Sequence, residues 1–173
     1  MAISLYDLSV VSFQQVLGSV GGFMDRGLSH CVENNIDPNT LLDATLHPTM
    51  LPFTFQIRSV VHHSIEAIDD VKKGVAGPPG AVGPLDYAGL QKMVADASAA
   101  LAKVTPEEVN ALEGNDMMFS MGSFKIPFTV EGFLMSFSIP NLHFHATTAY
   151  DILRTNGVPL GKRDYLGAMR LRG

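Results

Sequence analysis

The sequence feature that most constrains the fold is the helical periodicity of residues 129–157. On a wheel of 3.6 residues per turn, one face of this segment gathers Leu134, Ser138, Asn141, His145, Thr148, Ala149 and Ile152. The face is apolar at both ends and polar in the middle, where Asn141 and His145 lie on adjacent turns. We expect one long, mostly buried helix with a polar patch in the protein interior.

The ends of this helix carry clear signals. Thr129 can cap its first turn, and Asn156-Gly157 supplies a left-handed stop. Pro140 lacks an amide proton, so we expect the helix to break or bend there. A bend beside the polar patch would give room for a pocket.

Periodicity and capping predict three further long helices. We expect these long helices at 4–35, from about 50 to 73 and at 86–103. Short helical pieces are predicted at 38–46 and 106–112. A loop is predicted at 74–84 and a β-hairpin over 116–127. The glycines of the first helix predict either close approach of a neighbouring helix or a weakened segment. Pro127 must occupy a hairpin position that donates no ladder hydrogen bond. These elements predict an all-α fold, a four-helix bundle with a small β-hairpin before the last helix, in a single domain over residues 1–173.

Composition excludes several classes of protein. The 173 residues are 46% apolar and carry a formal net charge of −5 without a basic run, so nucleic acid is not an expected partner. Cys31 is the single cysteine, which excludes an internal disulfide and a Cys-x-x-Cys metal motif. The N-terminus lacks a basic signal region, and no apolar run is long enough to span a membrane. We expect a soluble, cytoplasmic protein without a membrane partner.

Two histidines on the second predicted helix are candidates for a site shared with the last helix. His62 and His63 flank its apolar stripe on opposite sides, so we expect a buried site to use one of them and the other to be exposed; Arg58 and Glu66 fall on the wet side. The candidate binding pocket consists of Asn141, His145, His62, His63 and Tyr150. One interpretation is a metal site on His145 and His62 that would hold Zn or Ni. The interpretation we favour has no cofactor, with Asn141 and His145 satisfying each other in a buried hydrogen-bond network.

The other side of the last predicted helix also carries polar residues. His143, Tyr150 and Asp151 could form an acid–base cluster. Asp151 is also placed to pair with Arg154, three residues further on, which favours a solvated or interface face.

Cys31 and the tail have a functional and a structural interpretation each. Cys31 lies on the apolar stripe of the first helix, which favours a buried thiol over a nucleophile. Lys162, Arg163 and Asp164 could bind an anionic ligand. We favour the interpretation in which they pin the tail to the bundle or to a partner subunit through hydrogen-bonded charge pairs.

Residues 139–158, IPNLHFHATTAYDILRTNGV, followed by GKRDYLG at 161–167, resemble the signature of an uncharacterised bacterial and fungal domain family. The start SLYDLSV at 4–10 and the pairs Asp37-Pro38 and Leu51-Pro52 are similar too, so the resemblance covers nearly the whole chain. That family in turn resembles the DinB-like superfamily of four-helix bundles. The resemblance implies the same bundle here.

The DinB-like superfamily often binds a divalent metal through one histidine of the second helix and two of the fourth. Carried onto this sequence, the fourth-helix pair falls on Asn141 and His145, and the second-helix ligand on His62 or His63. Position 141 departs from the pattern, because an Asn carbonyl is a weak ligand for Zn or Ni. Some superfamily members are thiol-dependent transferases or isomerases.

The sequence is therefore compatible with two functions. The first is an uncharacterised bundle protein that binds a small ligand in a polar pocket between the second and fourth helices, or that acts as a non-catalytic homodimer through exposed helix faces. The alternative is a DinB-like metal-dependent enzyme of the hydrolase or thiol transferase class. In the enzyme, a divalent metal at His145 and a second-helix histidine would activate water or a thiol.

Overall fold

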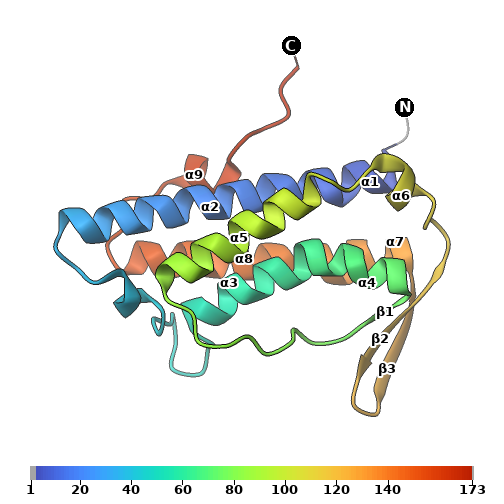
Figure 1. Cartoon of the computed structure of the whole chain (residues 1–173), viewed down its shortest axis with the longest axis horizontal. Coiled ribbons are helices and arrows are strands. Elements are labelled where there is room, and N and C mark those ends of the chain that lie inside the picture. The colour runs from blue at the N-terminus through green and yellow to red at the C-terminus, as the bar shows by residue number, and fades with distance from the viewer. Residues whose placement is uncertain (1–2, 173) are drawn as a thin grey trace.

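The computed structural model describes residues 3–172, which are mostly helical with one small sheet (Figure 1). The longer helices are α2 (Val10–Glu33), α3 (Phe53–Val61), α5 (Tyr87–Leu101) and α8 (Ile139–Thr155). The short helices are α1 (Leu5–Leu8), η1 (Pro38–Leu41), α4 (Ala67–Lys73), α6 (Pro106–Asn110), α7 (Val130–Phe133) and α9 (Lys162–Leu166). Two π-helical turns, η2 (His62–Glu66) and η3 (Leu134–Ser138), join α3 to α4 and α7 to α8.

The long helices lie side by side around one apolar core (Figure 1). α2 packs on α5 and α8, and α3 packs on the same two helices. The core contains fully buried aromatic and aliphatic side chains such as Phe13, Phe23, Phe53, Leu90 and Leu134. Burial of each of these is worth roughly 1.5–3 kcal/mol relative to exposure, so the core is the main source of stability. None of the helices within residues 3–172 combines the length and apolar character that crossing a membrane requires.

The N-terminal helix differs from the single element predicted over 4–35. α1 ends at Leu8 and α2 begins at Val10, because the backbone turns at Ser9, whose hydroxyl donates to the Leu5 carbonyl at 2.6 Å. The expected close approach to a glycine is present at Gly27, where a Cβ would lie 2.5 Å from Tyr87 Oη. A Cβ at Gly22 would meet nothing within 4 Å.

The sheet has the order β1-β2-β3, with β1 (Val75–Ala76), β2 (Asp116–Met121) and β3 (Phe124–Thr129). β2 and β3 form the predicted antiparallel hairpin, but β1 runs parallel to β2 and corrects the prediction of a plain loop at 74–84. The Met118 amide donates to the Gly74 carbonyl at 3.0 Å and so points toward β1. Pro127, opposite Met118, therefore lies at a position without a ladder bond to β2, where its missing amide proton costs nothing.

The π turns change which side chains face the interior. A π turn adds one residue to a helical turn, so it rotates the following side chains about the helix axis. His62 and His63 are both only 6% exposed, and the prediction that one of them faces solvent is wrong. Arg58 is 8% exposed, so its predicted place on the wet side is wrong too. In the last long helix the discontinuity expected at Pro140 takes the form of η3, which ends two residues before that proline.

Candidate functional site

Three histidines from two helices meet on one side of the core. The η2 turn supplies His62 and His63, whose ring centroids lie 4.7 Å apart. His145 of α8 stacks on His63 with a centroid distance of 5.6 Å and an interplanar angle of 4°. Phe55 and Phe137 pack edge-on against His145 and His63, so aromatic rings border the cluster. We call His62, His63 and His145 the histidine cluster.

Two of the three rings are oriented by polar side chains of α3 and η2. His62 Nδ1 lies 2.9 Å from Glu66 Oε2, and His145 Nδ1 lies 2.7 Å from Gln56 Oε1. Because Glu66 and the Gln56 carbonyl accept hydrogen bonds, each Nδ1 carries a proton, and the Nε2 of His145, whose ring is neutral at pH 7, presents a lone pair. Arg58 supports Glu66 with Nη1 and Nη2 at 2.9 and 3.0 Å from the two carboxylate oxygens. Burial opposes the charge of Glu66, but the hydrogen bonds from His62 and Arg58 hold the pKa of this carboxyl below its usual value.

The electrostatics keep two of the rings neutral. Burial, together with the neighbouring His62 and His145, lowers the pKa of His63 from 6.5 to about 3. Burial and the proximity of His62 lower the pKa of His145 to about 4. At pH 7 both imidazoles are therefore uncharged and offer a lone pair.

The free ring nitrogens of the cluster remain accessible to solvent. Within residues 3–172, the enclosed side-chain nitrogens and oxygens that lack a hydrogen-bond partner belong to Ser19, Arg58 and Ser59, and none belongs to a histidine. The nitrogens of His62, His63 and His145 that carry no hydrogen bond therefore keep a small exposed surface, although His62 and His63 are each only 6% exposed. This accessibility makes the cluster a place where a ligand could bind.

The cluster does not fit the divalent metal that the resemblance implies. A metal site requires at least three donor side chains that converge on one point. Asn141 replaces the further imidazole, and within residues 3–172 no three His, Cys, Asp or Glu side chains are grouped to hold a metal ion.

Asn141 and Tyr150 lie apart from the hydrogen bonds of the cluster. Asn141 Nδ2 donates to the Phe137 carbonyl at 2.7 Å, whereas His145 pairs with Gln56, so the predicted Asn141–His145 hydrogen bond is replaced by two others. Tyr150 packs edge-on against Phe23, at a centroid distance of 6.1 Å. Of the five predicted pocket residues, the structure brings together the three histidines.

The polar side of α8 is occupied by the C-terminal tail. His143 Nδ1 and Thr147 Oγ1 lie 3.1 and 3.0 Å from Tyr165 Oη. Arg154 donates to the Leu160 carbonyl and to Tyr150 Oη, and takes no part in the ion pair predicted with Asp151. Two of the three candidate acid–base residues therefore contact the tail: His143 through the Tyr165 hydroxyl, and Tyr150 edge-on against the Tyr165 ring.

The tail is fixed to α2 as well. Arg26 Nη1 lies 2.6 Å from Asp164 Oδ1, and Gln15 Nε2 donates to the Leu166 carbonyl at 2.8 Å. Lys162 and Arg163 are exposed and form no ion pair within the described part of the chain. Asp164 is thus the member of the predicted charge group that makes the contact.

Cys31 is enclosed by the core. The residue is 1% exposed, and burial, with the negative charge of Asp37, raises the pKa of its thiol. A buried thiol with a raised pKa is a poor nucleophile, in agreement with the structural interpretation of this residue.

Sequence reasoning missed three residues that orient the cluster: Gln56, Arg58 and Glu66. Arg58, His62 and Glu66 follow one another at spacings of four, which places them on one helix face and could have indicated their contact. The link from Gln56 to His145 spans 89 positions of the chain, and no local pattern indicates it.

Comparisons with known proteins agree with this architecture. The family model described as "Domain of unknown function (DUF1993)" matches residues 5–166. A crystal structure of a DinB family member protein from Shewanella denitrificans is similar, with 27% sequence identity and a TM-score of 0.78 over 98% of this chain and 95% of that chain. No curated protein matches the sequence.

Proposed function

We propose that this chain, which belongs to the DUF1993 family of domains of unknown function, binds a small ligand at the histidine cluster between α3–η2 and α8. The proposal takes its helices as a DinB-like four-helix bundle, supported by the similarity to the DinB family member. The observation that carries the proposal is the meeting of three imidazoles, two of them oriented by hydrogen bonds and two of them neutral, whose unpaired ring nitrogens are not fully enclosed. A polar group held this way in an apolar setting is typical of a ligand site.

The ligand chemistry follows from the ring nitrogens. His145 presents an Nε2 lone pair, because its Nδ1 proton is engaged by Gln56 and its ring is neutral. Such a site accepts hydrogen bonds, so the ligand needs a donor group such as an amine or a hydroxyl. The metal-dependent enzyme is the weaker candidate, because no three His, Cys, Asp or Glu side chains within residues 3–172 are grouped to hold an ion.

Histidine NMR tests the proposal directly. We expect a donor-bearing ligand from a fragment set to shift the ring resonances of His62, His63 and His145 and to leave exposed His47 unchanged. His145→Gln should abolish these shifts, whereas the control His47→Gln should not. A fragment set that shifts none of the three rings contradicts the proposal.

Metal analysis distinguishes ligand binding from the alternative, the metal-dependent enzyme. Protein purified without a histidine tag should contain less than about a tenth of an equivalent of Zn, Ni, Mn or Fe, as expected for a donor set that does not converge. A nearly stoichiometric metal content in the wild type that is lost in His145→Gln would contradict the ligand-binding proposal and support the metal-dependent enzyme.

We also propose a homodimer that uses exposed helix faces. Its support is the exposure of apolar side chains on η3 and α8, with Met135 of η3 at 55% and Phe144 of α8 at 57%. Sedimentation equilibrium tests it, and a monomer at all concentrations up to about 100 μM would contradict a dimer with micromolar affinity.

A further inference from the structure

We propose that a groove between the beginning of α3 and the loop of residues 78–85 binds a neutral, largely apolar molecule with a carbonyl oxygen that accepts hydrogen bonds from Arg58. The inference goes beyond the proposed function, because none of the three histidines of the cluster lines this groove. The groove is a second site with its own class of ligand.

The groove is a mostly apolar hollow with a volume of about 570 Å³. Its apolar walls include Leu51, Pro52, Phe55, Val82 and Leu85. The volume falls within the range of roughly 300–1,000 Å³ that small-molecule sites occupy. The apolar walls favour a ligand with a hydrocarbon body.

Arg58 is the residue of the lining that has unused hydrogen-bond donors. Its side chain is 10% exposed. Nη2 donates to Glu66 at 3.0 Å, whereas Nε and Nη1 are enclosed and have no hydrogen-bond partner, although Nη1 lies 2.9 Å from Glu66 Oε1. The Thr54 hydroxyl, which also belongs to the lining, already donates to the Leu42 carbonyl at 3.0 Å. Since a buried donor without a partner destabilises a folded protein, the guanidinium favours a ligand that carries an acceptor.

The charges around Arg58 favour a neutral acceptor over a carboxylate. Glu66 already matches the positive charge of Arg58. The exposed carboxylate of Asp43 adds a negative charge to the lining. Both carboxylates repel an anion, whereas the oxygen of a ketone, ester or amide accepts from the guanidinium without adding charge. A protonated amine is repelled by Arg58 and offers it no acceptor.

The loop of residues 78–85 covers the guanidinium and is weakly held. A Cβ at Gly80 would lie 3.9 Å from Arg58 Nη2, so the loop passes close to this end of the side chain. The loop makes no backbone–backbone hydrogen bond to any part of residues 3–172. Its prolines, Pro78, Pro79 and Pro84, lack the amide proton for such a bond. A segment without backbone hydrogen bonds opens at low cost, which gives a ligand access to the enclosed nitrogens.

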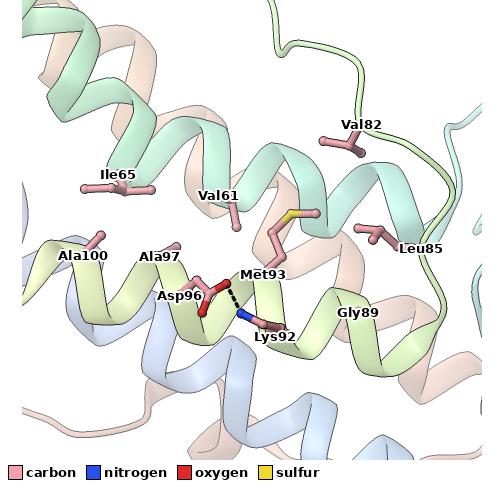
Figure 2. A pocket seen from close by; sticks show the side chains of 10 residues that line it. All are labelled: Val61, Ile65, Val82, Leu85, Gly89, Lys92, Met93, Asp96, Ala97 and Ala100. Atoms are coloured by element: carbon pink, nitrogen blue, oxygen red, sulfur yellow. Dashed lines mark hydrogen bonds and ion pairs between the residues drawn. The ribbon is translucent and has the colours of Figure 1, made fainter.

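A second cavity of about 510 Å³ borders the same loop and provides a comparison (Figure 2). It lies between α3–η2 and α5, and Val82 and Leu85 line both hollows. Figure 2 shows its charged side chains, Lys92 and Asp96, bound to each other at 2.6 Å. None of its lining residues has an enclosed donor without a partner. The preference for a carbonyl oxygen therefore belongs to the groove beside Arg58.

Three probes of equal carbon number and different head groups test the inference. Methyl hexyl ketone, octanoate and octylamine are titrated into the full chain at neutral pH, and NMR follows the Nε–H signal of Arg58 and the amide signals of Gly80 and Val82. We expect the ketone to bind about tenfold more tightly than either charged probe, as a hydrogen bond to a charged donor predicts. The ketone should shift all three signals, because its oxygen binds the guanidinium and its body lies against the loop.

Three variants separate the acceptor contact from the apolar contact. Arg58→Lys keeps the positive charge opposite Glu66 but lacks Nε, so the advantage of the ketone should disappear. Leu51 is 53% exposed, so Leu51→Ser should fold normally and weaken all three probes severalfold. The control Phe124→Ser changes a side chain that is 55% exposed and lies outside the lining, and it should weaken none.

The outcomes that overturn the inference differ between its parts. Equal or tighter binding of octanoate overturns the neutral ligand, and equal or tighter binding of octylamine overturns the acceptor. Unchanged affinities in Leu51→Ser, or no binding of any probe, overturn the groove. If Arg58→Lys does not fold, an unchanged Arg58 Nε–H signal in the ketone-bound wild type overturns the contact. Because the ketone has no donor for the histidine cluster, its failure to bind leaves the proposed function standing.

Discussion

The hydroxyl of Ser138 donates a hydrogen bond of 3.0 Å to the backbone carbonyl of His63. Ser138 closes the π turn η3 and His63 lies in the π turn η2, so the bond joins the two irregular turns across the helix interface. Both residues are buried. Since η2 turns His62 and His63 inward, this contact holds the backbone beneath the histidine cluster.

Loss of the Ser138 hydroxyl should destabilise the protein. Ser138→Ala leaves a buried carbonyl without its partner, so we expect the free energy of unfolding to fall by about 1–3 kcal/mol. Ser59 is the matched control, because its buried hydroxyl has no hydrogen-bond partner. Ser59→Ala should leave stability unchanged or raise it in the same urea titrations. Equal losses in the two variants would show that the bond to His63 contributes nothing.

Stability should depend on pH through the cluster. The pKa values of about 3 for His63 and about 4 for His145 lie below the value of 6.5 for a free imidazole. Between pH 6.5 and about 4 the unfolded chain therefore binds protons that the folded chain does not, and the free energy of unfolding falls as the pH falls. The slope should reach up to about 1.4 kcal/mol per pH unit for each ring.

Urea unfolding at pH 7.5, 6 and 5 measures this slope. His63→Asn should flatten it, whereas His47→Asn, at an exposed position, should not. A wild-type stability that stays constant from pH 7 to 5 would contradict the neutral state assigned to the two rings.

The carboxylate of Glu66 should matter more than that of an exposed ion pair. Glu66→Gln removes the charge that matches nearly buried Arg58, and since the Glu66 side chain is 37% exposed we expect a moderate loss of about 1–3 kcal/mol. The control is Asp96→Asn, which breaks the exposed pair with Lys92 and should cost less than about 1 kcal/mol. Thermal unfolding of both variants provides the comparison, and similar shifts in melting temperature would argue against a special role for Glu66.

A side chain at Gly27 should be poorly tolerated. A Cβ there would lie 2.5 Å from Tyr87 Oη, which donates to the Met24 carbonyl at 2.9 Å, so Gly27→Ala must displace a buried hydrogen-bonded ring. We expect a loss of about 1–3 kcal/mol from overpacking. Gly22→Ala meets open space in the same helix and should stabilise it by roughly 0.5–1 kcal/mol. A stabilised Gly27→Ala variant would contradict the close approach.

Much of the architecture could be predicted from the chain, because it depends on local periodicity. The apolar steps of α2 and the caps at Thr105 and Thr129 lie within single turns of helix, and the hairpin turn at Gly122 has a positive φ of 61°. The π turns have no comparable signature, since one inserted residue leaves the composition and the apolar pattern almost unchanged. Their effect falls on His62 and His63, which are both inside although the regular wheel separates them.

The site could be predicted only in part, for the same reason. His145 and His62 were identifiable as polar residues near apolar stripes, but their partners are set by the packing of α3 on α8. Gln56 reaches His145 across that interface, and Asn141 instead binds the backbone one turn before it. Hydrogen bonds between helices depend on rotations of a few tens of degrees, which a sequence pattern does not fix.

Pro127 has a consequence for association between copies of the protein. β3 is the outer strand of the sheet, and because Pro127 is turned away from β2, its nitrogen faces the open edge. A strand from a second molecule would find a missing donor there and the charge of Lys125 two residues before it. Extension of the sheet by a second molecule is thereby disfavoured at this edge.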